Sequence, residues 1–298
     1  MVDLTDAQER RDDLPSISVV IPTYNRRDKI ERAISSVLAQ TGQGKEYELT
    51  EIIVVDDGSS DDTQAVVEGL QSDLIRYHRL SQNGGAGRAR NEGVKLAKAE
   101  WIAFQDSDDF WMENKLSRQV WYIGKNSDVG ICCTGFRSQL SGDRYIDLCL
   151  QSVNEPVTVL SEKNFVDAPT IMIRKKIYEK LGGFDESLRA LEDWDLALRA
   201  CGEGRVLFVP EILVHADLSG SGVSSNAGNY YDARCRIIAK NRELLQHHDC
   251  LEGAMKALLE SAKQDRMLET VGRMLELHMN RADSRIATVE LQCDESAR

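Results

Sequence analysis

Four short segments that read as strands, three of them mainly apolar, are separated by stretches with helical spacing and constrain the fold of the first third of the chain. The segments are residues 17–21, 52–55, 75–79 and 101–104. Between the first two, apolar side chains recur at intervals of three and four residues, which is typical of an amphipathic helix. Strands that alternate with helices favour a largely parallel sheet with helices on its faces. We therefore expect an α/β protein.

Three of these strands end in polar residues. Pro22, Thr23 and Tyr24 follow the first strand, Asp56-Asp57 follow the second, and residues 106–109 follow the fourth. In open α/β sheets, ligands bind in the crevice beyond the carboxyl ends of the strands. The sequence therefore predicts that these three groups line one binding crevice.

The most acidic of these strand ends is the run Asp106-Ser107-Asp108-Asp109. Unpaired carboxylates cannot be buried cheaply, so we expect them to face water or a cation. Asp106 and Asp108 are two residues apart and point the same way in an extended chain. Paired carboxylates suit Mg²⁺ or Mn²⁺, ions that also take phosphate oxygens as ligands. The alternative interpretation is an acidic surface turn, because Asp is a common turn residue.

Composition excludes several classes of protein. The net charge of -12, without an offsetting basic stripe, argues against a nucleic-acid partner. Seven cysteines with no metal-ligand spacing predict a reducing compartment. There is no apolar run long enough for a transmembrane segment, and the N-terminus is polar and acidic. We expect a cytoplasmic protein, with any association with the inner face of the plasma membrane being peripheral.

The second half of the chain is less regular, and its expected elements are short. We expect strands at 129–134, 157–160, 170–173, 206–209 and 212–214, with a loop or hairpin at 136–154. Helical spacing predicts helices at 116–123, 175–181, from 192 onwards, and from 230 to about 279. The predicted organisation is a flexible leader (1–14), two halves of one domain (15–110 and 111–225) and a C-terminal helical extension (226–298). The apolar stripes of the extension suggest a packing face for the domain or for a homodimer.

The motifs occur in the order found in family 2 glycosyltransferases of the GT-A fold, which the chain resembles from residue 17 to about residue 215. The resemblance implies a Rossmann-like, mixed but mainly parallel sheet flanked by helices. Its motifs are Val20-Ile21-Pro22-Thr23-Tyr24-Asn25, Val54-Val55-Asp56-Asp57-Gly58-Ser59, Ala89-Arg90-Asn91-Glu92-Gly93, Asp106-Ser107-Asp108-Asp109, and Gly182-Gly183-Phe184-Asp185 with Glu192-Asp193.

The resemblance implies that residues 15–110 are the nucleotide-sugar-binding (donor) half of the domain and that residues 111–225 are its acceptor-binding half. It also implies roles for individual residues in the first half. One group would bind the nucleoside diphosphate part of the donor, with Arg90 facing the base or the diphosphate. The implied nucleotide-binding residues are Pro22, Thr23, Tyr24, Asn25, Asp56, Asp57, Arg90, Asp106 and Ser107. From the residues alone, the alternative for Asp56 and Asp57 is a role as turn residues, and the alternative for Arg90 is a solvated helix cation.

The implied metal and catalytic residues include the acidic run and a pair in the second half. Asp108, with Asp106, would hold Mn²⁺ or Mg²⁺, and His215 is a further ligand candidate in a less well matched setting. Asp193 would be the base that accepts the acceptor hydroxyl's proton, with Glu192 orienting the acceptor. The alternative for this pair is an ordinary acidic first helical turn. Phe110, Trp111 and Trp194 fit sugar stacking and core packing equally well.

We therefore expect an inverting, metal-dependent glycosyltransferase that uses a nucleoside diphosphate sugar, with UDP as the family's default nucleotide. The acceptor implied by the resemblance is a hydroxyl of a surface polysaccharide or lipid-linked glycan. Two alternatives stay open: a nucleotidyltransferase, and a non-catalytic protein that binds nucleotide sugars or acts as a scaffold. The sequence does not carry the basic Gly-rich signature of nucleotidyltransferases near its first strand.

Overall fold

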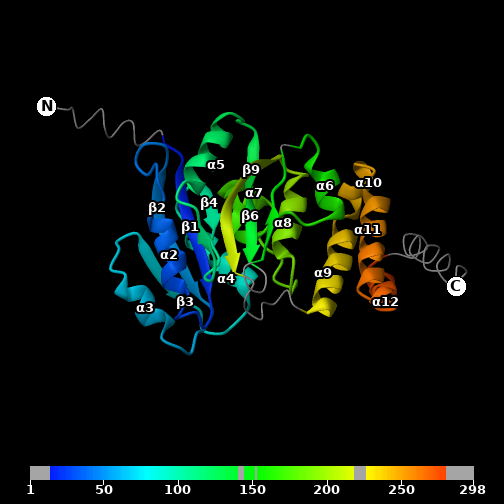
Figure 1. Cartoon of the computed structure of the whole chain (residues 1–298), viewed down its shortest axis with the longest axis horizontal. Coiled ribbons are helices and arrows are strands. Elements are labelled where there is room, and N and C mark those ends of the chain that lie inside the picture. Colours follow the sequence, from blue (N-terminus) through cyan, green and yellow to red (C-terminus); the bar gives the residue numbers. More distant parts are fainter. Residues whose placement is uncertain (1–13, 140–143, 152, 218–225, 280–298) are drawn as a thin grey trace, which may run out of the picture.

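The computed structural model describes residues 14–139, 144–151, 153–217 and 226–279, so the predicted leader and the end of the extension lie almost wholly outside the described residues. Its centre is a nine-stranded sheet with strand order β3-β2-β1-β4-β8-β6-β9-β5, in which β7 pairs with β6 (Figure 1). The strands are β1 (Ser16–Thr23), β2 (Glu48–Asp56), β3 (Ile75–Arg79), β4 (Trp101–Phe104), β5 (Phe110–Trp111), β6 (Val129–Gln139), β7 (Tyr145–Leu148), β8 (Ile171–Arg174) and β9 (Arg205–Asp217).

Helices cover both faces of this sheet, and the last four gather at the end of the molecule opposite β3 (Figure 1). The helices are α2 (Ile30–Leu38), α3 (Thr63–Gly69), α4 (Ala86–Leu96), α5 (Lys115–Gly124), α6 (Pro156–Glu162), α7 (Lys175–Lys180), α8 (Glu192–Ala200), α9 (Ala227–Lys240), α10 (Arg242–His247), α11 (Leu251–Gln264) and α12 (Leu268–His278), with a 3₁₀ turn, η1, at Ala168–Thr170. Among the described residues, none of these helices is long and apolar enough to cross a membrane.

The first half folds as the apolar pattern predicts. Strands β1, β2, β3 and β4 are parallel neighbours, and β1 and β4 are buried over most or all of their length. Burial on both faces explains why β1 and β4 read as mainly apolar runs rather than as alternating ones. The predicted α/β fold class is confirmed.

The second half contributes the antiparallel pairs of the sheet. Strand β8 runs antiparallel to both β4 and β6, while β6 and β9 are parallel. Because β8 is antiparallel to both β4 and β6, strands β6 and β9 run in the same direction as β4. The carboxyl ends of β1, β2, β3, β4, β6 and β9 therefore lie along one edge of the sheet, where ligands bind in this architecture.

Two of the predicted second-half elements differ from the structure. The apolar run 157–160 was expected to be a strand, but it belongs to the helix α6, which has Pro156 in its first turn. Proline is favoured there because its missing N–H is not needed. The two strands expected at 206–209 and 212–214 are one strand, β9, whose pairing with β6 shifts register around Pro210.

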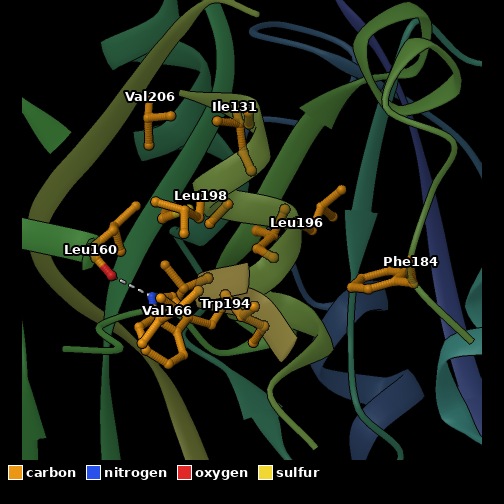
Figure 2. Packing of buried hydrophobic residues seen from close by; sticks show 14 of the residues in the cluster. Ile131, Leu160, Val166, Phe184, Trp194, Leu196, Leu198 and Val206 are labelled. Carbon is orange, nitrogen blue, oxygen red and sulfur yellow. Dashed lines mark hydrogen bonds between the residues drawn. The ribbon is translucent and has the colours of Figure 1, made fainter. Parts of the chain in front are cut away.

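Two buried clusters hold the helices to the sheet. The first joins α4, α8 and the C-terminal helices to one face of the sheet, and the second joins α2 and α5 to the other. Trp194 is nearly inaccessible in the first cluster, and its Nε1 donates a 2.6 Å hydrogen bond to the Leu160 carbonyl oxygen (Figure 2). Trp111 is buried in the second cluster. Both tryptophans thus belong to the core, and of the three candidate stacking aromatics only Phe110 is partly exposed.

Candidate active site

The loop after β1 is tied to the loop after β2. The Asn25 N–H donates to Ser59 Oγ at 2.8 Å, and Asn25 Oδ1 accepts from the Ser60 N–H at 2.8 Å. Asn25 adopts a left-handed backbone conformation with φ of 52°, which asparagine tolerates better than most residues. Next to it, Tyr24 is 46% exposed, while Pro22 and Thr23 are buried. Tyr24 thus presents an aromatic ring where a nucleobase is expected.

Asp56 and Asp57 are both buried, and both have partners within the chain. Asp56 accepts hydrogen bonds from the Ser59 N–H and the Tyr77 hydroxyl. Asp57 accepts from the N–H groups of Gly84 and Gly85, at 2.9 and 2.7 Å. Gly85 has φ of 90° and precedes α4 directly, so the Asp57 carboxylate fixes the turn that starts this helix. Nucleoside contacts by these two carboxylates stay a prediction.

Arg90 of α4 joins two motifs that are far apart in the sequence. Its guanidinium donates a 2.6 Å hydrogen bond to Asp106 and a 2.9 Å hydrogen bond to Glu192. The side chain is only 5% exposed, and the Phe184 ring lies 5.2 Å from it. The Asp106 and Glu192 carboxylates raise the pKa of Arg90 against the opposing effect of burial. Contact of Arg90 with a base or diphosphate stays a prediction; its observed role is to bridge the acidic run and the start of α8.

The acidic run lies in the turn between β4 and β5. Burial, together with the neighbouring Asp106 charge, raises the pKa of both Asp108 and Asp109. Asp108 is 3.4 Å from Arg26, and Arg32 donates to the Asp108 carbonyl oxygen at 2.6 Å. The raised pKa values mean that the charged forms of Asp108 and Asp109 are disfavoured there, and a hard cation would stabilise them.

Two neighbours of these carboxylates complete the turn. Ser107 is 7% exposed. Gln105, fully buried, donates from Nε2 to the Asp109 carbonyl oxygen at 2.8 Å, and its Oε1 has no hydrogen-bond partner within the described chain. Among the described residues, no group of three or more His, Cys, Asp or Glu side chains is arranged to hold a metal ion unaided. Asp106 and Asp108 are the side chains of this turn that could hold one together with ligand oxygens.

His215 lies beside the acidic run, on β9. Its ring stacks on Phe110 of β5 with centroids 4.7 Å apart and an interplanar angle of 18°. Burial and then the Arg137 charge lower the pKa of His215, so the imidazole is neutral at pH 7. A neutral imidazole is the form that ligates metals. His215 thus pairs across the strands with Phe110, the residue that follows the acidic run. Metal ligation by His215 stays a prediction.

Asp193 lies in the first turn of α8, one residue after Glu192. Leu191, which precedes the helix, has φ of 61°, a strained value for leucine, and such strain clusters at functional sites. Asp193 Oδ1 accepts from the Trp194 N–H at 2.7 Å. Burial, then the Glu192 and Asp167 charges, hold the pKa of Asp193 well above its usual range. A carboxylate with a raised pKa at the edge of a crevice is suited to proton transfer.

Asp167 is a member of this site that the sequence analysis missed. It precedes η1, whose segment passes the carboxyl end of β4, and its neighbour Val166 packs beside Trp194 (Figure 2). Burial and the charges of Asp109 and Asp106 raise the pKa of Asp167, which in turn affects Asp193. Asp167 therefore lies between the acidic run and the start of α8. No motif marks it, since its proximity arises from β8 returning beside β4.

The sequence places the chain in a known family. The glycosyl transferase family 2 profile matches residues 18–182, and the chain belongs to this family. An uncharacterised glycosyltransferase of Rickettsia typhi is 30% identical over 223 residues, covering 72% of this chain and 68% of that protein. The succinoglycan biosynthesis protein ExoO of Rhizobium meliloti is 34% identical over 214 residues, covering 67% of this chain and 60% of ExoO.

The fold agrees with this assignment. The chain is similar to S. aureus TarS residues 1–349 in complex with UDP-GlcNAc, with a TM-score of 0.68 at 21% identity. The similarity covers 88% of this chain and 81% of that one. The protein is therefore a family 2 glycosyltransferase with the GT-A fold, as the sequence analysis predicted.

Proposed function

We propose that the protein transfers a sugar from a UDP-sugar to an acceptor hydroxyl by a single displacement that inverts the anomeric carbon. The observation that carries this proposal is the buried Arg90 bridge, which holds Asp106 and Glu192 on either side of one guanidinium. The bridge brings the end of the donor-half strand β4 next to the helix that carries Asp193. In this arrangement Asp106 lies where the diphosphate would leave, and Asp193 lies where the acceptor hydroxyl would attack.

In the proposed mechanism, Asp193 accepts the proton of the acceptor hydroxyl as its oxygen attacks the anomeric carbon. The diphosphate leaves on the opposite face with the bonding electron pair, and the proton stays on an Asp193 oxygen. Glu192 is held by Arg90 and positions the acceptor beside this base. The raised pKa of Asp193 supports this role, because a base works best when its pKa approaches the working pH.

The chemistry of the acidic run fits a divalent cation. Asp106 and Asp108 supply hard oxygen donors, and burial with the neighbouring Asp106 charge raises the pKa of Asp108, so a cation there would stabilise its charged form. We propose that Asp106 and Asp108 hold Mn²⁺ or Mg²⁺, with His215 as a further ligand candidate. A divalent cation held by these residues would neutralise the charge that develops on the leaving diphosphate. Tyr24, next to Asn25 and the buried Asp56 and Asp57, would face the nucleoside.

The named relatives support the proposed substrate classes. ExoO is a succinoglycan biosynthesis protein. WfaP of Escherichia coli, which is 37% identical over 107 residues covering 36% of this chain and 41% of WfaP, is a UDP-Glc:alpha-D-GlcNAc-diphosphoundecaprenol beta-1,3-glucosyltransferase. TarS structures contain UDP or UDP-GlcNAc. We therefore favour a UDP-sugar donor and a polysaccharide or lipid-linked glycan acceptor. Family membership sets aside the nucleotidyltransferase alternative.

Calorimetric titration of the full chain with UDP, GDP, CDP and dTDP tests the donor site. We expect UDP to bind with Mn²⁺ present, and we expect EDTA to weaken that binding at least tenfold. Tighter binding of another nucleotide would replace UDP as the donor base. Absence of binding by all four nucleotides, with or without the metal, would refute the proposed donor site.

A further inference from the structure

Four side chains form a row across the neighbouring strands β7, β6, β9 and β5. In register, Asp147 of β7 lies opposite Arg137 of β6, Arg137 opposite His215 of β9, and His215 opposite Phe110 of β5. Residues paired in this way share one face of the sheet. The contacts agree with the register, since Arg137 pairs with Asp147 and His215 stacks on Phe110. The row therefore leads from the outer strand β7 to the residue that follows the acidic run.

This row lies on the same face as the proposed base. Its sequence neighbours Phe136, Val214 and Trp111 point into the second cluster, so the row points to the opposite face. That face also carries Ile131, which packs with α8 through Leu196 and Leu198 in the first cluster (Figure 2). The row and Asp193 thus lie on the same side of the sheet. Arg137 and His215 lie near the carboxyl ends of β6 and β9.

Tyr145 extends the row at its outer end. It lies two residues before Asp147, so both side chains point to the same face of β7. The Tyr145 ring is 50% exposed and lies 5.7 Å from the Arg137 guanidinium. The adjacent Ile146 is 47% exposed but points to the other face. The row face therefore offers an exposed aromatic ring beside an exposed ion pair.

The side chains of Tyr145, Arg137 and Asp147 are chemically suited to bind an uncharged sugar ring. Arg137 and Asp147 form two hydrogen bonds of 2.6 and 2.7 Å, and the side chains are 39% and 42% exposed. An ion pair this exposed contributes little to stability, so its geometry is available for another use. Together the pair presents donors and acceptors for neighbouring hydroxyls without a net charge. An aromatic ring with a polar tip packs against the apolar face of a sugar.

We infer that Tyr145, Arg137 and Asp147 form an acceptor subsite for an uncharged pyranose unit of the growing glycan. The inference deepens the proposed function, on which it rests. The subsite holds a sugar unit of the acceptor away from the reacting hydroxyl, and the row through His215 and Phe110 leads from it toward the acidic run. Phosphate-rich acceptors are disfavoured, because the pair is neutral and the chain carries a net charge of -12.

Ligand-observed saturation-transfer NMR on the full chain tests the subsite directly. The probes are maltose, cellobiose and N,N′-diacetylchitobiose, with glucose 6-phosphate as the charged comparison, each titrated with and without UDP and Mg²⁺. The variants are Tyr145→Ala, Tyr145→Phe and the matched control Ile146→Ala, which removes a neighbouring side chain of similar exposure from the other face. Circular dichroism verifies that each variant is folded.

We expect at least one uncharged disaccharide to bind, Tyr145→Ala to weaken that binding about tenfold, and Tyr145→Phe and Ile146→Ala to stay within about twofold. Equal effects of Tyr145→Ala and Ile146→Ala, tighter binding of glucose 6-phosphate, or no binding of any disaccharide would overturn the inference. The proposed donor function is tested separately, because it fails if UDP itself does not bind. In that case the titrations without nucleotide still report on the sugar subsite.

Discussion

The Arg90 guanidinium lies 2.9 Å from the Glu192 carboxylate, although 102 residues separate the two in the sequence. Asp106 occupies the other side of the same guanidinium. A buried cation between two carboxylates ties the turn after β4 to the start of α8. The turn after β4 and the start of α8 are therefore coupled electrostatically as well as by packing.

Arg90→Gln should lower the free energy of unfolding by about 3–5 kcal/mol, because it leaves two partly buried carboxylates without their cation. Lys95→Gln is the matched control on the same helix, since Lys95 is 67% exposed in its pair with Glu92. The control should change stability by less than about 0.5 kcal/mol. Urea unfolding at pH 7 measures both. A similar small change for the two variants would show that the Arg90 bridge does not stabilise the fold.

Gly93 fixes how closely α4, the helix of Arg90, approaches the sheet. A Cβ at this position would lie 2.3 Å from Val20 Cγ1 and 3.1 Å from Val55 Cγ2. Gly93→Ala should therefore destabilise the protein by about 1–3 kcal/mol through overpacking. In Gly87→Ala, on the same helix, the Cβ would meet Phe184 Cβ at 3.7 Å, an ordinary contact.

The better helix propensity of alanine should make Gly87→Ala neutral or stabilising by up to about 1 kcal/mol. Thermal unfolding of the two variants, side by side with the unmodified chain, distinguishes these effects. If Gly93→Ala proved as stable as Gly87→Ala, the close packing of α4 on β1 and β2 would be wrong.

Asp167→Asn should change the pH dependence of transfer. The Asp167 charge helps to raise the pKa of Asp193, so its removal lowers the pKa of Asp193. Asp193 must be deprotonated to act as a base, and activity is lost as the pH falls through its pKa. The acid limb of the profile of kcat/KM against pH should therefore move to lower pH in this variant.

The control for this experiment is Glu68→Gln, which removes one negative charge from exposed α3 at the far side of the donor half. Its acid limb should coincide with that of the unmodified chain. If the Asp167→Asn profile were unshifted, or shifted to higher pH, the charge of Asp167 would not be raising the pKa of the base.

The donor half was predictable because its information is local. Strands β1, β2 and β4 are mainly apolar runs that end in the polar residues of the predicted crevice, and the crevice follows from the shared direction of parallel strands. Asp56, Asp57 and the acidic run were found in this way. Their internal partners were not, because the bonds of Asp57 to Gly84 and Gly85 depend on how two loops meet.

The acceptor half was less predictable because its proximities depend on long-range pairing. A four-residue apolar run such as 157–160 fits a strand and a helix equally well, and the helical outcome is fixed by Pro156 and by packing against α8 and α11. Asp167 enters the site only because β8 returns antiparallel to β4. The row from Asp147 to Phe110 depends on the register of four strands, which no local pattern specifies.

The Asp193→Asn variant tests most directly whether Asp193 is the base of a glycosyl transfer in this crevice. UDP binding is measured by calorimetry, and UDP release from a panel of UDP-sugars is measured with the disaccharides above as acceptors. Glu186→Gln, an exposed carboxylate just before α8, is the control. We expect Asp193→Asn to bind UDP within about threefold of the unmodified chain and to lose turnover by about 10²–10⁴-fold. Turnover equal to that of Glu186→Gln would contradict the account and favour a protein that binds nucleotide sugars without transferring them.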